Sequence, residues 1–462
     1  MLKRARLSSA SSLLLLCLLL VLVSACDLPG SGSSGSSTPT ATHAMTNSPT
    51  VSATPQTVPM PATDTSCPAA DTARPAVMRT LVRAQLQNLI YIYNEVPQNT
   101  STAVGHLRRY DVSNGHKAEI ISSGIRIDQA QISADGQWVL FLSIPDPRDD
   151  SQHSALLQLV RMDGEGLQTL YCFPATTYSN TTTNTSRKLP ISIQWSVDQK
   201  SILISESTNS ALSKVFLLDV TTGSISQLFL DQKDTSYYYS VVTWLDNTHF
   251  YLIKQGLSAP TPPATVYLVD ASKATVTTPG LVKILTTTTR MSFYSLDSSY
   301  DGTLLYSSYC SQAGGPFSTN IQVGPSIGGT RHTIYQEQPK DCIQSLRAIS
   351  ASKLLLLMQI ASGNGIYKSQ IWIMDLLSNS PTTVATLTST NSGQTGYSLN
   401  PTTQYTWSNI SRDSSFYALQ AIDPVANNQT ILVGPLKGGD LTAVAVTNPG
   451  NSTVSLAGWT TL

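Results

Sequence analysis

A tandem repeat dominates this chain: about every fifty residues, two short apolar runs are joined by a tight polar turn. Similar copies of its second half read VFLLDVTTG at 215–223, VYLVDASKA at 266–274 and IWIMDLLSN at 371–379. Two more, VGPSIGG at 323–329 and VGPLKGG at 433–439, are nearly identical strings. A period of this size, built from strand signals, predicts a radial array of small sheets and not one enclosed core.

Each unit has two halves, and each half is a strand, a turn and a second strand. The second-half turns begin at Asp111, Arg161, Asp219, Asp270, Gly324, Asp375 and Gly434. The first-half turns are built on Asp135, Asp198, Asp246, Asp301 and Asp413, with Ser352 in the remaining slot. Asp suits such turns because its carboxylate accepts hydrogen bonds from nearby backbone amides. Four strands in each of seven units predict an all-β, seven-bladed β-propeller, with six or eight blades left open by the degenerate first unit.

Tryptophans indicate how the ring closes. Trp195, Trp244 and Trp407 each end the first strand of a unit, and Trp459 ends a similar run that no further unit follows. The first unit, which begins near residues 88–93, lacks a clear strand of this kind. We therefore expect the C-terminal strand to complete the first blade, which removes two exposed sheet edges.

The first-half strings resemble the WD40-like repeats of TolB-type propellers, in which an apolar strand, Ser-Pro-Asp-Gly and another apolar strand follow one another. Ser133-Ala134-Asp135-Gly136 and Ser196-Val197-Asp198 match this pattern with the proline replaced. The resemblance covers roughly residues 88–450 and implies the fold, but it says little about function. The combined Gly-His…Trp-Asp pattern of true WD40 repeats is missing.

The first 26 residues have the features of a secretion signal. Lys3, Arg4 and Arg6 precede an apolar stretch at 13–23, which is shorter than the roughly 20 residues of a membrane-spanning helix. It ends in Val-Ser-Ala-Cys at 23–26, which resembles the lipobox of bacterial lipoproteins. The resemblance implies cleavage before Cys26, a lipid on its sulfur, and a bacterial membrane protein facing outside the cytoplasm. The alternative is an ordinary signal peptide with an incidental cysteine.

Composition divides the rest of the chain. Residues 27–75 are rich in Ser, Thr, Pro and Gly, which predicts a disordered tether, and 76–462 carry the propeller. The formal net charge is +0 and only 12% of residues are charged. The absence of a basic stripe argues against nucleic acid as a partner. We expect a monomer with no cofactor.

Cys67, Cys172, Cys310 and Cys342 lie in the mature part of the chain. An even number of cysteines outside the cytoplasm suggests disulfides, and four cysteines allow three pairings. We favour Cys310–Cys342, because both fall in one repeat, and Cys67–Cys172, which would tie the end of the tether to the domain. The alternative is that all four are buried free thiols.

No catalytic or metal site is predicted. The string at 324–328 fits Gly-x-Ser-x-Gly, but it lies in a hairpin turn whose copy at 434–438 has Leu436 in place of Ser326. A serine nucleophile needs a strand-to-helix turn and a histidine partner. The six histidines are scattered singly, without metal-ligand spacing. Asp146, Asp149 and Asp150 cluster in one loop, which we interpret as a solvated acidic loop and not as a calcium site.

Long connections between the tight turns should all emerge on one face of the propeller, where loops on a rigid scaffold usually carry function. Tyrosines suit such a face because they make large contacts at low entropic cost. The candidate binding residues are Tyr178, Tyr237, Tyr238, Tyr239, Phe317, Tyr367 and Tyr397. We predict a binding or scaffolding module for a protein or an envelope polysaccharide. The alternative is a propeller enzyme, a glycoside hydrolase or lyase acting on extracellular glycans.

Overall fold

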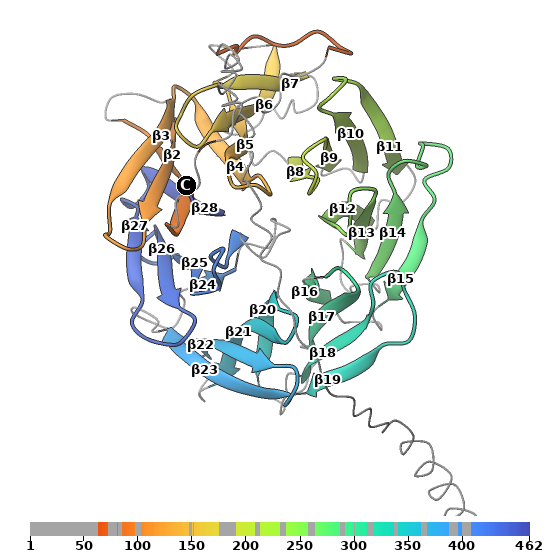
Figure 1. Cartoon of the computed structure of the whole chain (residues 1–462), viewed down its shortest axis with the longest axis vertical. Helices are drawn as coiled ribbons and strands as arrows, with labels where there is room; N and C mark the ends of the chain where they lie inside the picture. The colour runs from red at the N-terminus through yellow and green to blue at the C-terminus, as the bar shows by residue number, and fades with distance from the viewer. Residues whose placement is uncertain are drawn as a thin grey trace, which may run out of the picture. The chain divides into compact units, whose positions relative to one another are not determined.

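The computed structural model describes residues 63–72, 81, 86–97, 103–146, 150, 152–174, 191–207, 213–231, 237–256, 264–286, 292–299, 301–311, 318–336, 341–361, 367–387, 396–399 and 408–462. These residues form 28 strands, and none of them lies in an α-helix. The strands make seven four-stranded antiparallel sheets arranged in a ring (Figure 1). The predicted all-β, seven-bladed propeller is confirmed.

The blades are numbered along the chain and their strands run from the centre outward. Blade 1 holds β28 (Ser452–Thr460), β1 (Asn88–Glu95), β2 (Val104–Asp111) and β3 (Lys117–Ser123); blade 2 holds β4 (Arg126–Ile132), β5 (Trp138–Ile144), β6 (His153–Arg161) and β7 (Gln168–Pro174); blade 3 holds β8 (Ile191–Trp195), β9 (Ser201–Ser207), β10 (Ser213–Asp219) and β11 (Ile225–Asp231). Blade 4 holds β12 (Tyr237–Trp244), β13 (His249–Gly256), β14 (Thr265–Asp270) and β15 (Val282–Thr286); blade 5 holds β16 (Ser292–Ser298), β17 (Leu304–Ser311), β18 (Ser318–Pro325) and β19 (His332–Gln336). Blade 6 holds β20 (Cys342–Ser350), β21 (Lys353–Ala361), β22 (Tyr367–Asp375) and β23 (Ser380–Leu387); blade 7 holds β24 (Gly396–Ser398), β25 (Phe416–Asp423), β26 (Asn428–Pro435) and β27 (Thr442–Val446).

The C-terminal strand closes the ring, as expected from Trp459. β28 is the innermost strand of blade 1 and pairs antiparallel with β1, placing Leu89 opposite Trp459. Trp459 is fully buried in a cluster that also contains Ile431 and Val433 of blade 7. Trp195 and Trp244 end β8 and β12 as predicted, whereas Trp407 lies outside the described residues.

The core is divided among the seven blade interfaces. Alternate side chains of one strand point to opposite faces of its sheet, so each strand feeds two interfaces. In β5, Leu140 packs against blade 3, and Phe141 packs against blade 1. This arrangement explains why apolar runs such as WVLFLSI are continuous and do not alternate with polar residues.

A Ser-x-Asp device shapes the first-half turns. In blade 2 the Ser133 hydroxyl donates to Asp135 Oδ1 at 2.5 Å, and the same oxygen accepts from the Gln137 backbone N–H at 3.0 Å. Ser196, Ser299 and Ser411 repeat the hydroxyl bond to their aspartates. Gly136 follows with a φ of 77°, the left-handed conformation that favours glycine.

Polar side chains on the first two strands of a blade bind the backbone of the next blade. Gln131 of β4 donates from Nε2 to the Ile193 carbonyl at 2.7 Å and accepts from the Trp195 N–H at 3.0 Å. Asn94 of β1 forms the same two-way bond with the backbone of Ile127 at 2.8 and 2.9 Å. These bonds satisfy buried backbone groups that β-pairing within one blade leaves open.

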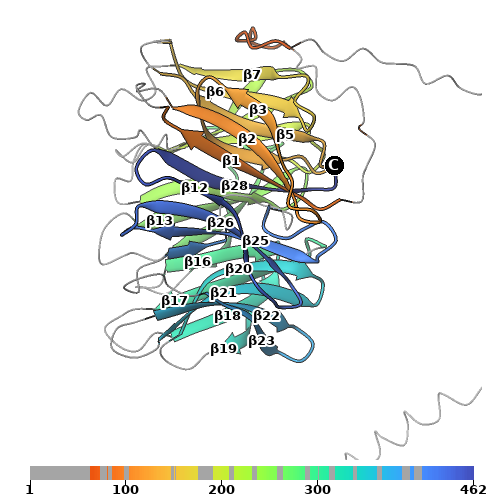
Figure 2. The same cartoon turned by 90° about the vertical axis from the view of Figure 1, so that its left-hand side faces the viewer.

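The up-and-down strand order separates two faces of the ring (Figure 2). The turns between strands 1 and 2 of blades 2–7 share one face with the turns between strands 3 and 4 of every blade, and this is called the tight-turn face. The remaining connections emerge on the opposite, long-connection face, and most of the long segments predicted there lie outside the described residues. Residues 1–62, including Cys26, also lie outside them. In the part of the chain that is described, no helix is long and apolar enough to cross a membrane.

Candidate functional site

Three of the seven predicted binding aromatics have described side chains. Tyr178 and Phe317 lie outside the described residues, as do the side chains of Tyr238 and Tyr367, although the backbones of these two tyrosines belong to β12 and β22. Tyr237, Tyr239 and Tyr397 remain, and they come from the inner strands of blades 4 and 7.

Tyr237 opens β12 at its long-connection end and is only partly buried. The Lys254 Nζ of β13 lies 3.9 Å from the centroid of its ring, a distance at which a cation is attracted to the ring face. The same ammonium is 5.6 Å from the ring of Tyr239. Blade 4 therefore presents a tyrosine with an attached positive charge on the face predicted to bind.

Tyr239 has a different environment. Its side chain is 9% exposed, and its ring centroid lies 4.8 Å from that of Phe229 in the core between blades 3 and 4. Burial raises the pKa of the Tyr239 hydroxyl. Tyr239 is therefore a core residue, and the expectation of an exposed contact residue does not hold at this position. Tyr397 is also partly buried, against the core between blades 6 and 7.

A second charged and aromatic cluster lies in blade 1 and was not foreseen from the sequence. His106 of β2 is 8% exposed, with Nδ1 2.8 Å from Glu119 Oε2 and Nε2 3.6 Å from Glu95 Oε1. The Arg108 guanidinium lies 4.6 Å from the centroid of the Tyr93 ring. The sequence signal that could have found this cluster is that His106 and Arg108 stand two positions apart on β2, which places both side chains on one face of the sheet. The rings of Tyr93 and Tyr237, each with a cation beside it, both lie near the long-connection ends of their strands.

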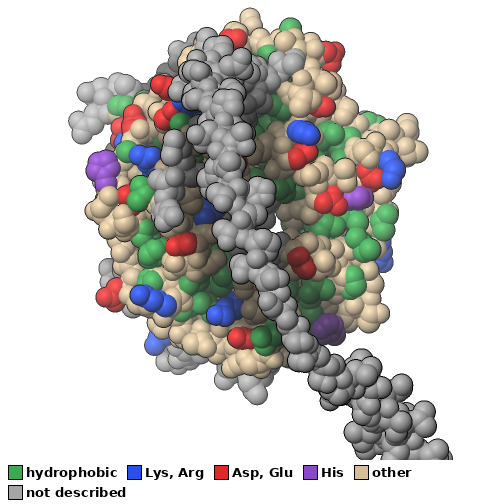
Figure 3. All heavy atoms as spheres, viewed as in Figure 1, with side chains coloured by type: hydrophobic (Ala, Val, Ile, Leu, Met, Phe, Trp, Pro, Cys, Tyr) green, Lys and Arg blue, Asp and Glu red, His purple; other side chains and the backbone are tan. Residues whose placement is uncertain are grey.

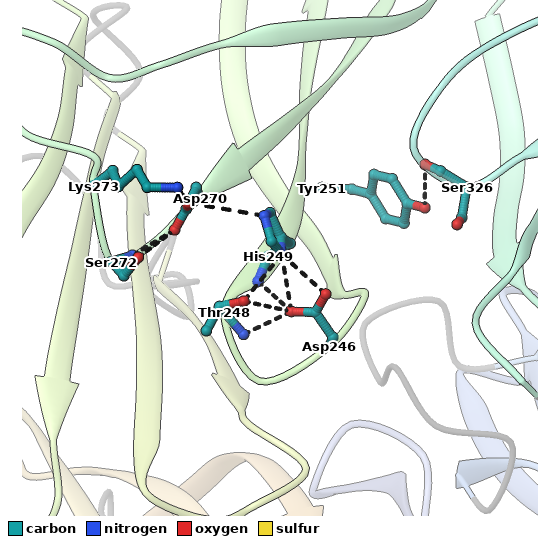
Figure 4. A network of polar contacts seen from close by, with 8 residues as sticks. All are labelled: Asp246, Thr248, His249, Tyr251, Asp270, Ser272, Lys273 and Ser326. Atoms are coloured by element: carbon teal, nitrogen blue, oxygen red, sulfur yellow. Dashed lines mark hydrogen bonds and ion pairs between the residues drawn. The ribbon is translucent and has the colours of Figure 1, made fainter.

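The Gly-x-Ser-x-Gly turn is built for packing. Ser326 is 5% exposed, and its backbone carbonyl accepts a hydrogen bond of 2.8 Å from the Tyr251 hydroxyl of blade 4 (Figure 4). Leu436 is similarly buried, at 7% exposure, in the equivalent turn of blade 7. A strand, β19, follows the serine turn, where a nucleophile elbow has a helix.

On the tight-turn face, His249 joins two turns of blade 4 (Figure 4). Its Nδ1 lies 2.9 Å from Asp246 Oδ2, and its Nε2 lies 3.9 Å from Asp270 Oδ2. Lys273 donates to the same Asp270 oxygen at 2.6 Å, and this bond, followed by that of Ser272, lowers the pKa of Asp270 to about 2. The Asp246 carboxylate also accepts from two backbone amides, so this network ties turns together and offers no uncommitted acid or base. On the face seen in Figure 3, acidic and basic side chains are scattered among polar ones.

The inner strands contain two carboxylates among the described residues, and each has an arginine partner. Asp128 of β4 lies 3.2 Å from Arg126, and Asp297 of β16 lies 3.9 Å from Arg347 of β20. The Asp297–Arg347 pair is buried, at 4% exposure for each residue. Asp297 also accepts from the Ala348 N–H at 2.8 Å, and Arg347 Nε donates to Asn409 at 3.2 Å. The pair therefore links blades 5, 6 and 7.

Desolvation outweighs attraction within this pair. Burial raises the pKa of Asp297 to about 6, although the Arg347 charge and two backbone amides oppose the rise. Burial likewise lowers the pKa of Arg347, against the charge of Asp297. Both groups are thus shifted toward their neutral forms, because a separation of 3.9 Å does not replace the hydration that each has lost.

The predicted Cys67–Cys172 disulfide is confirmed, with Cα atoms 5.8 Å apart. Cys342 is also disulfide-bonded. The side chain of Cys310 lies outside what is described, so the pairing Cys310–Cys342 stays a prediction. Among the described residues, Cys67, Cys172 and His153 form one group in which three potential metal-ligand atoms lie close together.

No protein-family model matches the chain, and no curated protein matches it. Among solved structures, TolB from Acinetobacter baumannii is 13% identical over 79% of this chain and 82% of its own, with a TM-score of 0.42. An oligogalacturonate lyase in complex with manganese is 12% identical over 79% and 86%, with a TM-score of 0.46. The β-propeller domain of the Trilobed protease from Pyrococcus furiosus is 12% identical over 82% and 97%, with a TM-score of 0.48. At these identities the likeness concerns the fold alone.

Proposed function

We propose that this protein is a lipoprotein, anchored through Cys26 to a bacterial membrane, whose propeller acts outside the cytoplasm as a binding or scaffolding module. Its partner would be a protein or a cell-envelope polymer. The observation that carries the proposal is the Asp297–Arg347 pair. This inner-strand carboxylate is buried and committed to joining blades, whereas a catalytic acid must be accessible to substrate.

Glycan hydrolysis uses two carboxyl groups about 5–10 Å apart that flank the scissile bond. Asp128 and Asp297, the described inner-strand carboxylates, stand on blades 2 and 5, and each is paired with an arginine. These two residues therefore favour the binding module over a glycoside hydrolase that would use them as its carboxyl pair.

The binding residues with the best support are Tyr237 and Lys254. A tyrosine ring offers a large contact area with few rotatable bonds, and the ammonium beside it adds a positive charge. This pair suits an acidic polymer or a protein surface rich in carboxylates.

Replacing Tyr237 and Lys254 by alanine should weaken the partner's binding while the propeller stays folded. Loss of a central aromatic contact costs about 2 kcal/mol or more, which is roughly 30-fold in affinity. The measurement is crosslinking and pull-down from intact cells, followed by titration of the captured partner. Leu377→Ala serves as the matched control, because Leu377 is 87% exposed in a turn of the opposite face. Equal affinity of the double variant and wild type would refute the site.

Cys26→Ser should move the protein from the membrane fraction to the soluble fraction, because lipid chains supply the membrane affinity and the serine cannot accept them. Metabolic labelling with a radioactive fatty acid checks the same residue directly. Continued labelling of the Cys26→Ser protein would remove the anchor from the proposal.

A further inference from the structure

Residues 63–67 form an added edge on blade 2. Asp64 makes a parallel bridge with Gln168 of β7, its N–H donates to the Leu167 carbonyl at 3.0 Å, and its own carbonyl accepts from the Thr169 N–H at 2.9 Å. The Thr169 hydroxyl also donates to the Thr65 carbonyl at 3.0 Å. These bonds hold Cys67 beside β7 without help from its sulfur.

His153, the first residue of β6, reaches the disulfide from the adjacent strand. Its Nε2 lies 3.5 Å from Cys67 Sγ. One ligand atom each from Cys67, Cys172 and His153 lie within 4.8 Å of one another. Cys67 is exposed and the other two are partly buried, so solvent and small solutes can reach the cluster.

Asp150 orients the His153 ring. Its Oδ2 lies 2.8 Å from His153 Nδ1. Asp150 is itself held in place, because its Oδ1 accepts from the backbone N–H groups of Gln152 and His153 at 2.9 and 3.1 Å. With Nδ1 turned toward the carboxylate, Nε2 is the ring nitrogen that faces the sulfurs. Metal-binding histidines are held in the same way by carboxylates on their far nitrogen.

We propose that reduction of the Cys67–Cys172 disulfide creates a site for a thiophilic divalent cation, Zn²⁺. The two cysteine sulfurs and His153 Nε2 would be its protein ligands, with a solvent molecule completing a tetrahedral set. Two equivalents of an external thiol supply the two electrons and leave as their own disulfide, while the protein gains two thiol groups. Zn²⁺ then displaces the two thiol protons, since only thiolates bind the metal.

The inference is independent of the partner-binding proposal. Its physical consequence concerns residues 63–67, which lead toward the predicted anchor. A zinc ion shared by Cys67 and blade 2 would keep this segment attached after the covalent bond is broken. Loss of both the disulfide and the zinc ion would leave residues 63–67 attached to blade 2 by their hydrogen bonds to β7 alone.

The test uses the full chain in detergent, reduced anaerobically with a phosphine that is then removed, and Co²⁺ as a spectroscopic probe. Reduced protein should bind one Co²⁺ with a thiolate-to-metal absorption band that Zn²⁺ abolishes, and oxidised protein should not. Cys67→Ser should lose the band. His153→Ala and Asp150→Asn should each weaken Co²⁺ binding, the latter by about 10- to 100-fold.

Two controls separate this site from others. His249→Ala removes a histidine that also has an aspartate on Nδ1 but belongs to a different blade, and Cys342→Ser breaks the other disulfide. Both should bind Co²⁺ as wild type does. Absence of the band in reduced protein, its survival in Cys67→Ser, or unfolding on reduction would each overturn the proposal.

Discussion

At the scale of single residues, a buried carboxylate helps to join the blades of the propeller. Asp297 is buried between blades with a pKa of about 6, above the ordinary value of 3.8. At pH values between 3.8 and about 6, Asp297 binds more protons in the folded state than in the unfolded state. The free energy of unfolding that Asp297 contributes is therefore fully present below about pH 4 and is lost as the pH rises through 6.

Asp297→Asn should remove this dependence. The difference in free energy of unfolding between wild type and the variant should fall by about 3 kcal/mol from pH 4 to pH 7, because one pKa unit corresponds to about 1.4 kcal/mol. Denaturant unfolding at a series of pH values measures it. Asp128→Asn is the control, since Asp128 is a more exposed inner-strand carboxylate. Parallel profiles for wild type and Asp297→Asn would show that Asp297 does not titrate in this range.

At the scale of elements, turns reach across blades as well as within them. Arg412 follows Ser411 in the first-half turn of blade 7 and donates to the carbonyls of Trp459, Ala134 and Ser133 at 2.9, 2.8 and 3.0 Å. One side chain therefore joins blade 7, the closing strand and the first-half turn of blade 2.

Arg412→Ala should destabilise the domain by about 2–4 kcal/mol, because three carbonyls lose a charged donor at once. Calorimetric melting is the direct measurement. Arg109→Ala provides a comparison of the same chemistry, as Arg109 makes one longer bond of 3.4 Å to the Leu462 carbonyl. A melting temperature for Arg412→Ala no lower than that of Arg109→Ala would contradict this role.

The sequence predicts the structure within a blade better than it predicts side-chain contacts between blades. Repeated aspartates predict the turns, because each turn is made by residues close together in the chain. Trp459 predicts ring closure, because it repeats the position of Trp195 and Trp244 at the end of a first strand. Arg347 and Asp297 pair across a blade interface, and the sequence of neither strand indicates which residue of the other blade it will contact. The long connection before Tyr239 predicts an exposed side chain, yet Tyr239 packs against Phe229 and is buried. The His153 cluster was missed because it joins the tether to blade 2.

At the scale of the whole molecule, stability depends on β28. Deleting residues 453–462 should lower the melting temperature of all seven blades together, because it exposes the edge of β1 and removes Trp459 from the core between blades 7 and 1. Loss of a buried tryptophan alone costs about 3–5 kcal/mol. Deletion of residues 27–62 should leave melting unchanged. If both truncated proteins melted like the full chain, the ring would not require its closing strand.

The closing strand also sets an order of events in synthesis. Leu89 and Trp459 pair in blade 1 although they are far apart in the chain, so β1 emerges long before its inner partner exists. At about 5–20 residues per second, hundreds of residues take tens of seconds to make. During that interval the first blade has an unpaired edge, the backbone of which can pair with a strand of another chain.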